Sequence, residues 1–335
     1  MKKCNIGGQG VLEGVMMRSQ TASGLAVRRA TGEIVFEKEP VKSATQKNGF
    51  TKLLFVRGVV SFVDMMIYGV KTTTKSAKLF GEEEEYKPSR FEKFVAKKTG
   101  KDAMDIAMVL AVIIALVLAV GIFFMLPFAL TELVKSHVES DILKGLIEGG
   151  IRLVIFLLYI AGIRLLKDIK RVFQYHGAEH KTINCYEHEE PLTVENIQKY
   201  GTLHPRCGTS YLLLVVVISI LLYSLIPWEI SRLAKIGLRL ALLPVVAGIA
   251  YEFLKFAARS DSWFFRAIRW PGLMLQKLTT AQPDDSMVET AIVAFQAALG
   301  EMDDESLKAL ADGFARPVKT EVKSTEAEEA PQAES

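Results

Sequence analysis

Long apolar blocks alternate with short charged stretches through the middle of the chain. The clearest block, 106–130, has 25 residues without a charge, enough for a helix to cross about 30 Å of hydrocarbon at about 1.5 Å per residue. Three further blocks of this kind are 143–166, 211–228 and 236–256. The pattern therefore predicts a mainly α-helical, polytopic membrane protein with about four transmembrane helices.

Lysine and arginine are concentrated in every second connection between these blocks. They cluster before the first block and after the second and the fourth, whereas the other two connections contain Lys135, and then Arg232 and Lys235. Basic residues close to the ends of spans favour the cytosolic side. Both termini and the 167–210 loop are therefore predicted to be cytosolic.

The first 50 residues predict a small mixed α/β cytosolic portion. Residues 24–29 and 33–39 have strand-like composition, and a glycine-containing turn joins them, which is typical of a β-hairpin. Several glycines come before the hairpin, but their spacing matches neither of the two common phosphate-binding loops. Close backbone packing is therefore favoured over nucleotide binding as the reason for these glycines.

Residues 51–80 are predicted to form a helix at the membrane surface. The apolar run 53–70 is nearly long enough to span a bilayer, but Arg57 and Asp64 lie inside it, and charges at that depth are costly. An interfacial, re-entrant or protein-buried helix is therefore favoured over a span.

After the fourth apolar block, 260–278 mixes aromatic and basic residues, as is typical of a segment in the lipid headgroup region. Residues 287–299 have helical apolar spacing, and the polar C-terminal tail predicts disorder. The chain is thus divided into a glycine-rich and β-hairpin segment, an interfacial helix, a charged linker, a four-span membrane domain, a second cytosolic segment and a tail: 1–50, 51–80, 81–104, 105–256, 257–313 and 314–335.

Composition excludes several classes of protein. Half of the residues are hydrophobic, in agreement with an integral membrane protein, and a net charge of +3 gives no reason to expect nucleic acid as a partner. Three cysteines form no disulfide framework and suit a reducing compartment. The first residues contain no apolar core of a cleavable signal peptide.

The 174–210 stretch contains most of the histidines and cysteines of the chain. His176, Glu179 and His180 form an H-x-x-E-H pattern, which puts two imidazoles on one face of a helix with a carboxylate that can act as a base. His204 and Cys207 add an H-x-x-C turn. This donor set predicts a divalent metal, with Zn²⁺ favoured and Fe²⁺ as the alternative. The competing interpretation is that these polar groups only organise a loop.

Further residues of this stretch are assigned supporting roles. Cys185 is held as a reserve ligand, and Glu179 is the candidate catalytic base if one metal position stays open to water or substrate. The candidates for anion binding, proton transfer and support of the ligands are Lys181, Asn184, Tyr186, Arg206 and Thr209.

Four ionisable residues lie within the less hydrophobic blocks. Glu148 and Arg152 are one helical turn apart and can form a pair, and Arg239 is predicted close enough to Glu148 for a pair between helices. Glu252 is predicted near the cytosolic side, where an interfacial position is favoured over a role as a ligand.

Several long motifs resemble the bacterial YqhQ-like family, whose function is unknown and whose members are labelled predicted metal-dependent enzymes. The motifs are GGQGVLEGVMMR at 7–18, HGAEHKTINCYE at 176–187, PLTVEN at 191–196, TLHPRCGTS at 202–210, LLPVVAGIAYE at 242–252 and PGLMLQKLTT at 271–280. The resemblance implies a multi-span protein of the bacterial cytoplasmic (inner) membrane with a metal near the histidine-rich loop. It implies no particular reaction.

The sequence thus favours an integral membrane, metal-dependent enzyme, best described as a hydrolase at the cytosolic membrane face. Two alternatives stay open. One is a non-enzymatic factor, for membrane-protein biogenesis or as a scaffold, with a structural metal. The other is a transporter that uses the charges within the membrane. The expected partners are the lipid bilayer and either another membrane protein or a second copy of the chain.

Overall fold

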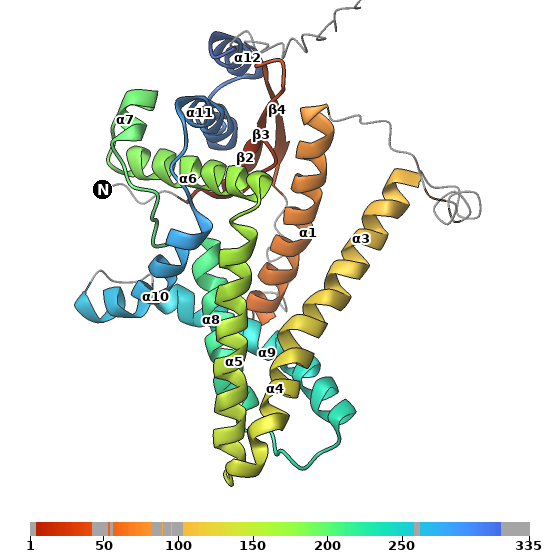
Figure 1. The fold of residues 1–335 in the computed structure, drawn as a ribbon. Coiled ribbons are helices and arrows are strands. Elements are labelled where there is room, and N and C mark those ends of the chain that lie inside the picture. The colour runs from red at the N-terminus through yellow and green to blue at the C-terminus, as the bar shows by residue number, and fades with distance from the viewer. Residues whose placement is uncertain are drawn as a thin grey trace, which may run out of the picture.

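A computed structural model describes residues 5–41, 53, 56–81, 89, 95, 103–257 and 262–315. The chain is mainly helical with a small antiparallel sheet. A soluble part, which contains the sheet, lies at one end of a group of long apolar helices (Figure 1). Most of the predicted charged linker, 81–104, and nearly all of the predicted polar tail lie outside the described residues.

The sheet is a four-stranded antiparallel meander in which each strand pairs with the next one along the chain. Its strands are β1 (Gly7–Val11), β2 (Gly14–Arg18), β3 (Ala22–Arg28) and β4 (Ile34–Pro40). β3 and β4 form the predicted hairpin. The glycine-rich stretch before it, from which no strand was predicted, forms the hairpin of β1 and β2.

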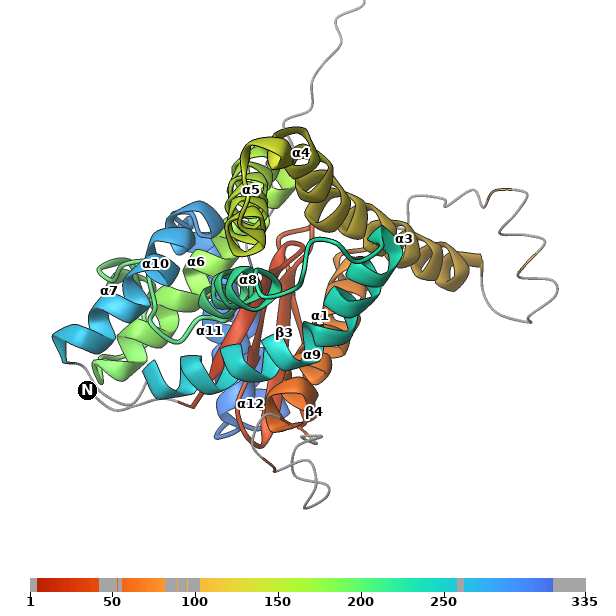
Figure 2. The same ribbon diagram turned by 90° about the horizontal axis from the view of Figure 1, so that it is seen from below.

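Side chains along each strand alternate between the two faces of the sheet, and helices cover both faces. Val15 and Met17 point into a core that includes Phe295, whereas Met16 points to the opposite side and packs near Tyr68. The first face is covered by α6 (Lys167–Glu187) and α11 (Asp285–Leu299), and the second by α1 (Val56–Phe80), as Figure 2 shows. Two short helices, α7 (Val194–Gln198) and α12 (Asp304–Gly313), complete the soluble part.

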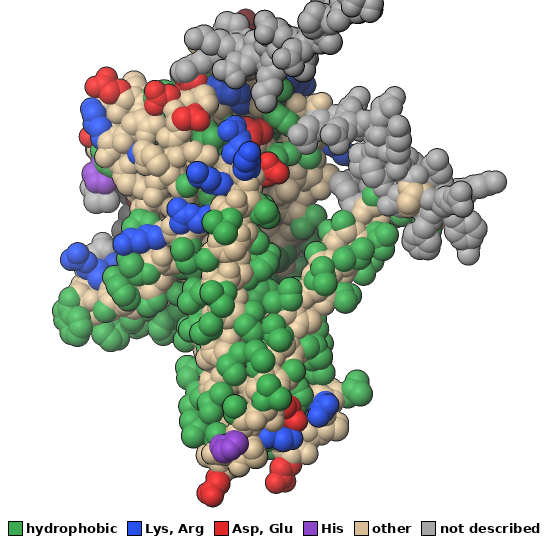
Figure 3. Space-filling view, viewed as in Figure 1, with side chains coloured by type: hydrophobic (Ala, Val, Ile, Leu, Met, Phe, Trp, Pro, Cys, Tyr) green, Lys and Arg blue, Asp and Glu red, His purple; other side chains and the backbone are tan. Residues whose placement is uncertain are grey.

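Within the described part of the chain, three helices are long and apolar enough to cross a membrane: Val109–His137, Asp141–Ile163 and Arg232–Ala257. The first is built from α3 (Ala103–Val120), a π-helical turn (Gly121–Met125), α4 (Leu126–Val134) and a short 3-10 turn (Lys135–His137). The other two are α5 and α9. Their apolar surfaces are visible in Figure 3.

The predicted span 211–228 is shorter than expected. It corresponds to α8 (Gly208–Tyr223), an apolar helix of 16 residues, which is about 24 Å long at 1.5 Å per residue. The last helical residue is Tyr223, and Ser224 is its C-cap. Where the sequence predicts four spans, the described residues thus contain three helices long enough to cross a membrane, and a shorter apolar helix stands at the position of the fourth.

Two elements lie where the soluble part meets the apolar helices. α10 (Trp263–Thr279) projects sideways there, with basic side chains above hydrophobic ones (Figures 1 and 3). Trp263 and Trp270 are exposed. α1 connects the two parts, because Arg57 pairs with Glu252 of α9 while Lys75 pairs with Glu37 of β4 at 2.5 Å. Glu252 thus belongs to a helix contact and lies apart from the histidine cluster.

Both predicted ion pairs of Glu148 are present. Its carboxylate accepts hydrogen bonds from Arg152 at 2.7 Å and from Arg239 of α9 at 2.5 and 2.6 Å. All three side chains are buried. Their cluster joins α5 to α9 inside the group of apolar helices.

Candidate functional site

The histidines of the H-x-x-E-H pattern lie on one buried face of α6. A helix places residues three and four positions apart on the same side, so His176, Glu179 and His180 all face the loop 199–207. The ring centroids of the two histidines are 4.5 Å apart. All three side chains are buried.

Cys207 reaches this face of α6 from a distant part of the sequence. It lies at the N-cap of α8, where its sulfur accepts a hydrogen bond from the Thr209 amide. The Sγ atom is 3.2 Å from His176 Nε2. One donor atom each of His176, His180 and Cys207 lie within 4.8 Å of one another, so these three residues could hold one metal ion.

Backbone carbonyls fix the orientation of both imidazoles. His176 Nδ1 lies 2.9 Å from the Thr279 carbonyl oxygen, and His180 Nδ1 lies 2.5 Å from that of Thr202. Since a carbonyl oxygen only accepts, Nδ1 carries the proton in each ring and donates it, which leaves an Nε2 lone pair free. Histidines that bind metals in proteins are commonly held in this way.

Two buried atoms at the cluster have no hydrogen-bond partner among the described residues: His180 Nε2 and Glu179 Oε2. Buried polar atoms are nearly always paired, so unpaired ones need an explanation. Burial lowers the pKa of the His180 imidazole, which favours the neutral form that can bind a metal. The donor set and its free lone pairs therefore fit a divalent metal ion.

Glu179 stands beside the three donor atoms. Its Oε1 accepts a hydrogen bond from the Gly8 amide of β1 at 2.8 Å, and its Oε2 is 3.8 Å from His176 Nε2. Burial raises the pKa of this carboxyl, while His176, His204 and the Gly8 amide act in the opposite direction. Glu179 would therefore be adjacent to a metal ion if the three donors held one.

His204, predicted as a ligand, is close to the cluster but is not one of its three members. Its ring centroid is 5.8 Å from that of His180, and its Nε2 points to Glu187 at 3.5 Å. Its backbone amide and carbonyl are both held by the side chain of the buried Gln276, each at 2.8 Å. Burial lowers the pKa of the His204 imidazole.

Cys185, the reserve ligand, is not brought to the cluster. Its side chain is buried in the core of the soluble part, and the sulfur contacts the Glu190 carbonyl at 3.8 Å. Burial raises the pKa of this thiol to about 11, which disfavours the thiolate that metals bind.

The residues assigned supporting roles divide into two groups. Asn184 holds the loop through the carbonyls of Gly201 and Leu203, and the Thr209 hydroxyl lies 3.1 Å from Cys207 Sγ. Lys181 and Tyr186 are turned away from the cluster, whereas Arg206 lines the cavity beside it. Lys181 donates to the Gln198 carbonyl, Tyr186 packs on Phe295, and Arg206 pairs with Glu187.

Sequence reasoning missed several residues that shape this site. Glu187 and Gln276 both lie within the motifs that carry the family resemblance, so their position there was an available signal. The carbonyls of Thr202 and Thr279 and the amide of Gly8 contribute only backbone atoms. Because nearly every residue type has the same backbone carbonyl and amide, these roles could not be recognised from the sequence.

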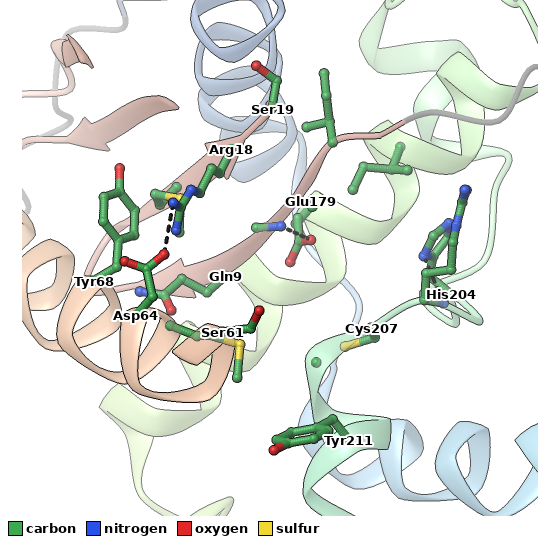
Figure 4. Close-up of a pocket in the computed structure, with 18 of the residues that line it drawn as sticks. Gln9, Arg18, Ser19, Ser61, Asp64, Tyr68, Glu179, His204, Cys207 and Tyr211 are labelled. Carbon is green, nitrogen blue, oxygen red and sulfur yellow. Dashed lines mark hydrogen bonds and ion pairs between the residues drawn. The ribbon is translucent and has the colours of Figure 1, made fainter. Parts of the chain in front are cut away.

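A cavity of about 600 Å³ opens beside the cluster. Glu179, His204 and Cys207 line one side of it, and Asp64 and Tyr68 of α1 line the other, as Figure 4 shows. Its volume is within the usual range for pockets that bind small molecules. The candidate metal donors therefore adjoin a space large enough for a substrate.

Comparison with known proteins places the chain in a family without an established function. A family model described as "Protein of unknown function (DUF1385)" matches residues 53–301, and the chain belongs to that family. The chain is 36% identical over 296 residues to the "Uncharacterized protein YqhQ" of Bacillus subtilis (strain 168), a match that covers 88% of this chain and 92% of that protein. The resemblance to the YqhQ-like family is thereby confirmed. No solved structure matches the chain.

Proposed function

We propose that this protein is a membrane-embedded, metal-dependent hydrolase that acts at the cytosolic membrane face. One observation carries the proposal: three donor atoms of His176, His180 and Cys207 converge, and the unpaired Oε2 of Glu179 lies beside them. A loop organised only by polar groups would be expected to pair the buried His180 Nε2 and Glu179 Oε2 as well, as His176 Nε2 is paired with Cys207 Sγ.

The proposed ligands are the Nε2 atoms of the two histidines and the sulfur of Cys207. Two imidazoles and a thiolate suit Zn²⁺ best, with Fe²⁺ as the alternative. Three protein ligands are the usual number in catalytic zinc sites. When bound, such a metal supplies Lewis-acid chemistry, because it withdraws electron density from oxygen atoms of water or substrate.

Glu179 is proposed to move the proton during hydrolysis. The oxygen of a water molecule forms a bond to the electrophilic carbon of the substrate, and the bond from that carbon to the leaving group breaks. One proton of the water goes to Glu179, which then passes it to the leaving group.

The membrane arrangement is proposed to have four spans and cytosolic termini in the bacterial cytoplasmic membrane. α8 would be the fourth span, because it packs beside α5 and α9 through Gly145 on one side and Tyr211 on the other. A helix of about 24 Å can be accommodated by local thinning of the bilayer. The distribution of basic residues supports the orientation.

Metal analysis of the purified protein tests the proposal directly. We expect about one zinc or iron per chain in the wild type, and a loss of most of it in His180→Ala and Cys207→Ser, because each change removes one of three donors. Inductively coupled plasma mass spectrometry of gel-filtered, detergent-solubilised protein measures this ratio. His188→Ala is the matched control, since His188 is exposed and contacts only Asn184 and Tyr200. A wild type without metal would contradict the proposal.

The second candidate is a non-enzymatic membrane factor with a structural metal. The nearness of His204 favours it, because rotation of that ring could bring a fourth donor beside His180 and close the metal site. A hydrolase requires Glu179 as a base, whereas a structural metal site does not.

Glu179→Gln separates the two candidates. The change keeps the size of the side chain and the acceptor for the Gly8 amide but removes the base. If the protein is a hydrolase, metal content should stay within about twofold of wild type, while activity falls by about 100-fold or more, the usual contribution of a general base. Complementation of a deletion strain by this variant measures function without a known substrate. Full complementation with metal retained would favour the structural factor.

A further inference from the structure

The cavity beside the candidate metal donors has walls from both parts of the protein. β1 and β2 contribute Gln9 and Arg18 from the soluble part, and α8 and α9 contribute Tyr211 and Tyr251 from the apolar helices. α1 closes the remaining side with Phe62 and its neighbours (Figure 4). The cavity thus lies where the soluble part meets the ends of the proposed spans.

The walls of this cavity combine apolar and polar groups. The part contributed by α1, α8 and α9 includes Phe62, Met65, Tyr211, Tyr251 and Leu254. The part contributed by the strands and α6 includes the polar Gln9, Arg18 and Glu179 together with the apolar Met16 and Ile183. A ligand that fills the space must therefore present a polar part to Glu179 and an apolar part to the ends of the spans.

Charge along the walls is balanced by ion pairs. Arg18 pairs with Asp64 at 3.1 Å and lies over the ring of Tyr68, with 4.7 Å between its guanidinium carbon and the ring centroid. Arg206 pairs with Glu187. Because each cation already has a carboxylate partner, the cavity does not select for a free anion. It suits a polar group that both donates and accepts hydrogen bonds.

The volume of the cavity favours a small molecule over a transmembrane helix as the occupant. About 600 Å³ is typical of pockets that bind small ligands, whereas a helix with its side chains is about 10 Å wide along its whole length. An extended peptide would be expected to pair with the free edge of β1, as happens when strands are added to a sheet. The outward amide of Gly8 on that edge is already bonded to Glu179. A small amphiphile fits the volume of the cavity and needs no hydrogen bonds from the edge of β1.

We infer that the cavity binds a single membrane-derived amphiphile, a lipid or lipid fragment. Its polar group lies at Glu179 and Cys207, and its hydrocarbon chain lies along Phe62, Tyr251 and Leu254. For the reaction, the inference rests on the proposed hydrolase. The binding of the amphiphile is supported separately by the residues that line the cavity. The substrate class is then a small amphiphilic ester or amide.

A photoreactive fatty hydroxamate with 12 carbons and a diazirine near the end of the chain tests this inference. The hydroxamate group chelates metals, and the diazirine labels whatever surrounds the chain. In protein reconstituted into nanodiscs, illumination should label residues of α1 and α9 that line the cavity, as peptide mass spectrometry would map. Affinity should exceed that of acetohydroxamate by at least about 100-fold, or ~2.7 kcal/mol, because burial of only about three to four of the additional methylenes, at ~0.8 kcal/mol each, gives that gain.

Two substitutions on the same helix provide the matched pair. Leu254→Trp narrows the part of the cavity contributed by α1, α8 and α9 and should weaken binding of the fatty hydroxamate by about tenfold or more. Leu240→Trp adds the same side chain at an exposed position of α9 away from the cavity walls, and should change binding by less than about twofold. Equal effects of the two substitutions would overturn the inference.

The labelling pattern and the metal content separate the two proposals. In His180→Ala the hydroxamate should bind less tightly but label the same residues. Labelling of the cavity in a protein without metal would support amphiphile binding and refute the hydrolase. Metal at one per chain with labelling confined to lipid-facing positions would refute amphiphile binding and leave the hydrolase standing. Tighter binding of a tripeptide hydroxamate than of the fatty one would overturn the inference in favour of a peptide.

Discussion

Glu148→Gln is expected to destabilise the group of apolar helices more than any other single substitution of a carboxylate. The Glu148 side chain is 1% exposed and accepts hydrogen bonds from both Arg152 and Arg239. A neutral amide would leave two guanidinium groups buried without a countercharge. Removal of one partner from a buried ion pair typically costs about 3–5 kcal/mol, and here one change removes the partner of two cations.

Thermal unfolding in detergent, followed by the loss of the monodisperse peak in size-exclusion chromatography, measures this effect. We expect the midpoint of Glu148→Gln to fall by roughly 10 °C, since about 1 kcal/mol corresponds to about 2–4 °C in a domain of this size. Glu139→Gln is the control, because Glu139 is exposed in the connection before α5 and should leave the midpoint within about 1 °C.

A triple substitution distinguishes unpaired charge from lost packing. When Glu148, Arg152 and Arg239 are all replaced by leucine, no charge is left without a partner, and much of the lost stability should return. Such a recovery would show that the three charges serve to join α5 to α9, so their presence inside the membrane would not by itself indicate transport. If the triple variant also supports the cellular function that the protein performs, the transporter alternative is refuted.

The positions of the apolar helices could be predicted because each is specified by its own composition. Residues 106–130 contain no charge, and basic residues mark the ends of the blocks, so the signal is local. The length of α8 could not be predicted in the same way. Its apolar run continues to Trp228, but the helix ends at Tyr223, because Trp228 donates its amide to Asp141 of α5 in a contact between distant residues.

β1 and β2 were missed for a related reason. Glycine is a poor strand former, and the GGQGV run has no alternation of apolar and polar residues. The strand forms because it packs on α6, where Gly10 lies so close to the backbone of Val172 and His176 that a β-carbon would not fit. The interpretation of these glycines as points of close backbone packing agrees with this contact, although the strand itself could not be derived from it.

The candidate site was predictable only where helical spacing determines it. The H-x-x-E-H pattern alone places His176, Glu179 and His180 on one face of α6. Cys185 is also on α6, but it lies five residues after His180, which turns it away from the face that carries the two histidines. The choice between His204 and Cys207 depends on how the loop 199–207 folds back. Gln276 of α10 fixes that loop through the backbone of His204, and no feature of the loop sequence indicates this partner.

Gly177→Ala is expected to remove most of the bound metal without removing a ligand. A β-carbon at Gly177 would meet the backbone carbonyl of Ala281, so α6 and the segment after α10 would have to separate. Three hydrogen bonds attach α6 to this segment and to the end of α10: Ala281 N to the Phe173 carbonyl at 2.9 Å, Gln174 Nε2 to the Gln282 carbonyl at 3.1 Å, and His176 Nδ1 to the Thr279 carbonyl at 2.9 Å. Displacement of this segment would release His176 from the orientation that directs Nε2 toward Cys207.

Loss of such a supporting hydrogen bond usually lowers metal affinity by about 10–100-fold, and we expect a loss in that range for Gly177→Ala. Competition with a fluorescent zinc chelator measures it, and circular dichroism shows whether the variant is folded. Gly150→Ala is the control: it is also a glycine within a helix, yet a β-carbon there meets nothing within 4 Å. That substitution should keep zinc affinity and raise stability by up to about 1 kcal/mol, because alanine favours helix over glycine. Wild-type zinc affinity in folded Gly177→Ala would mean that the contact between α6 and the segment after α10 does not orient the histidines. In that case α6 and Cys207 alone would determine the geometry of the metal site.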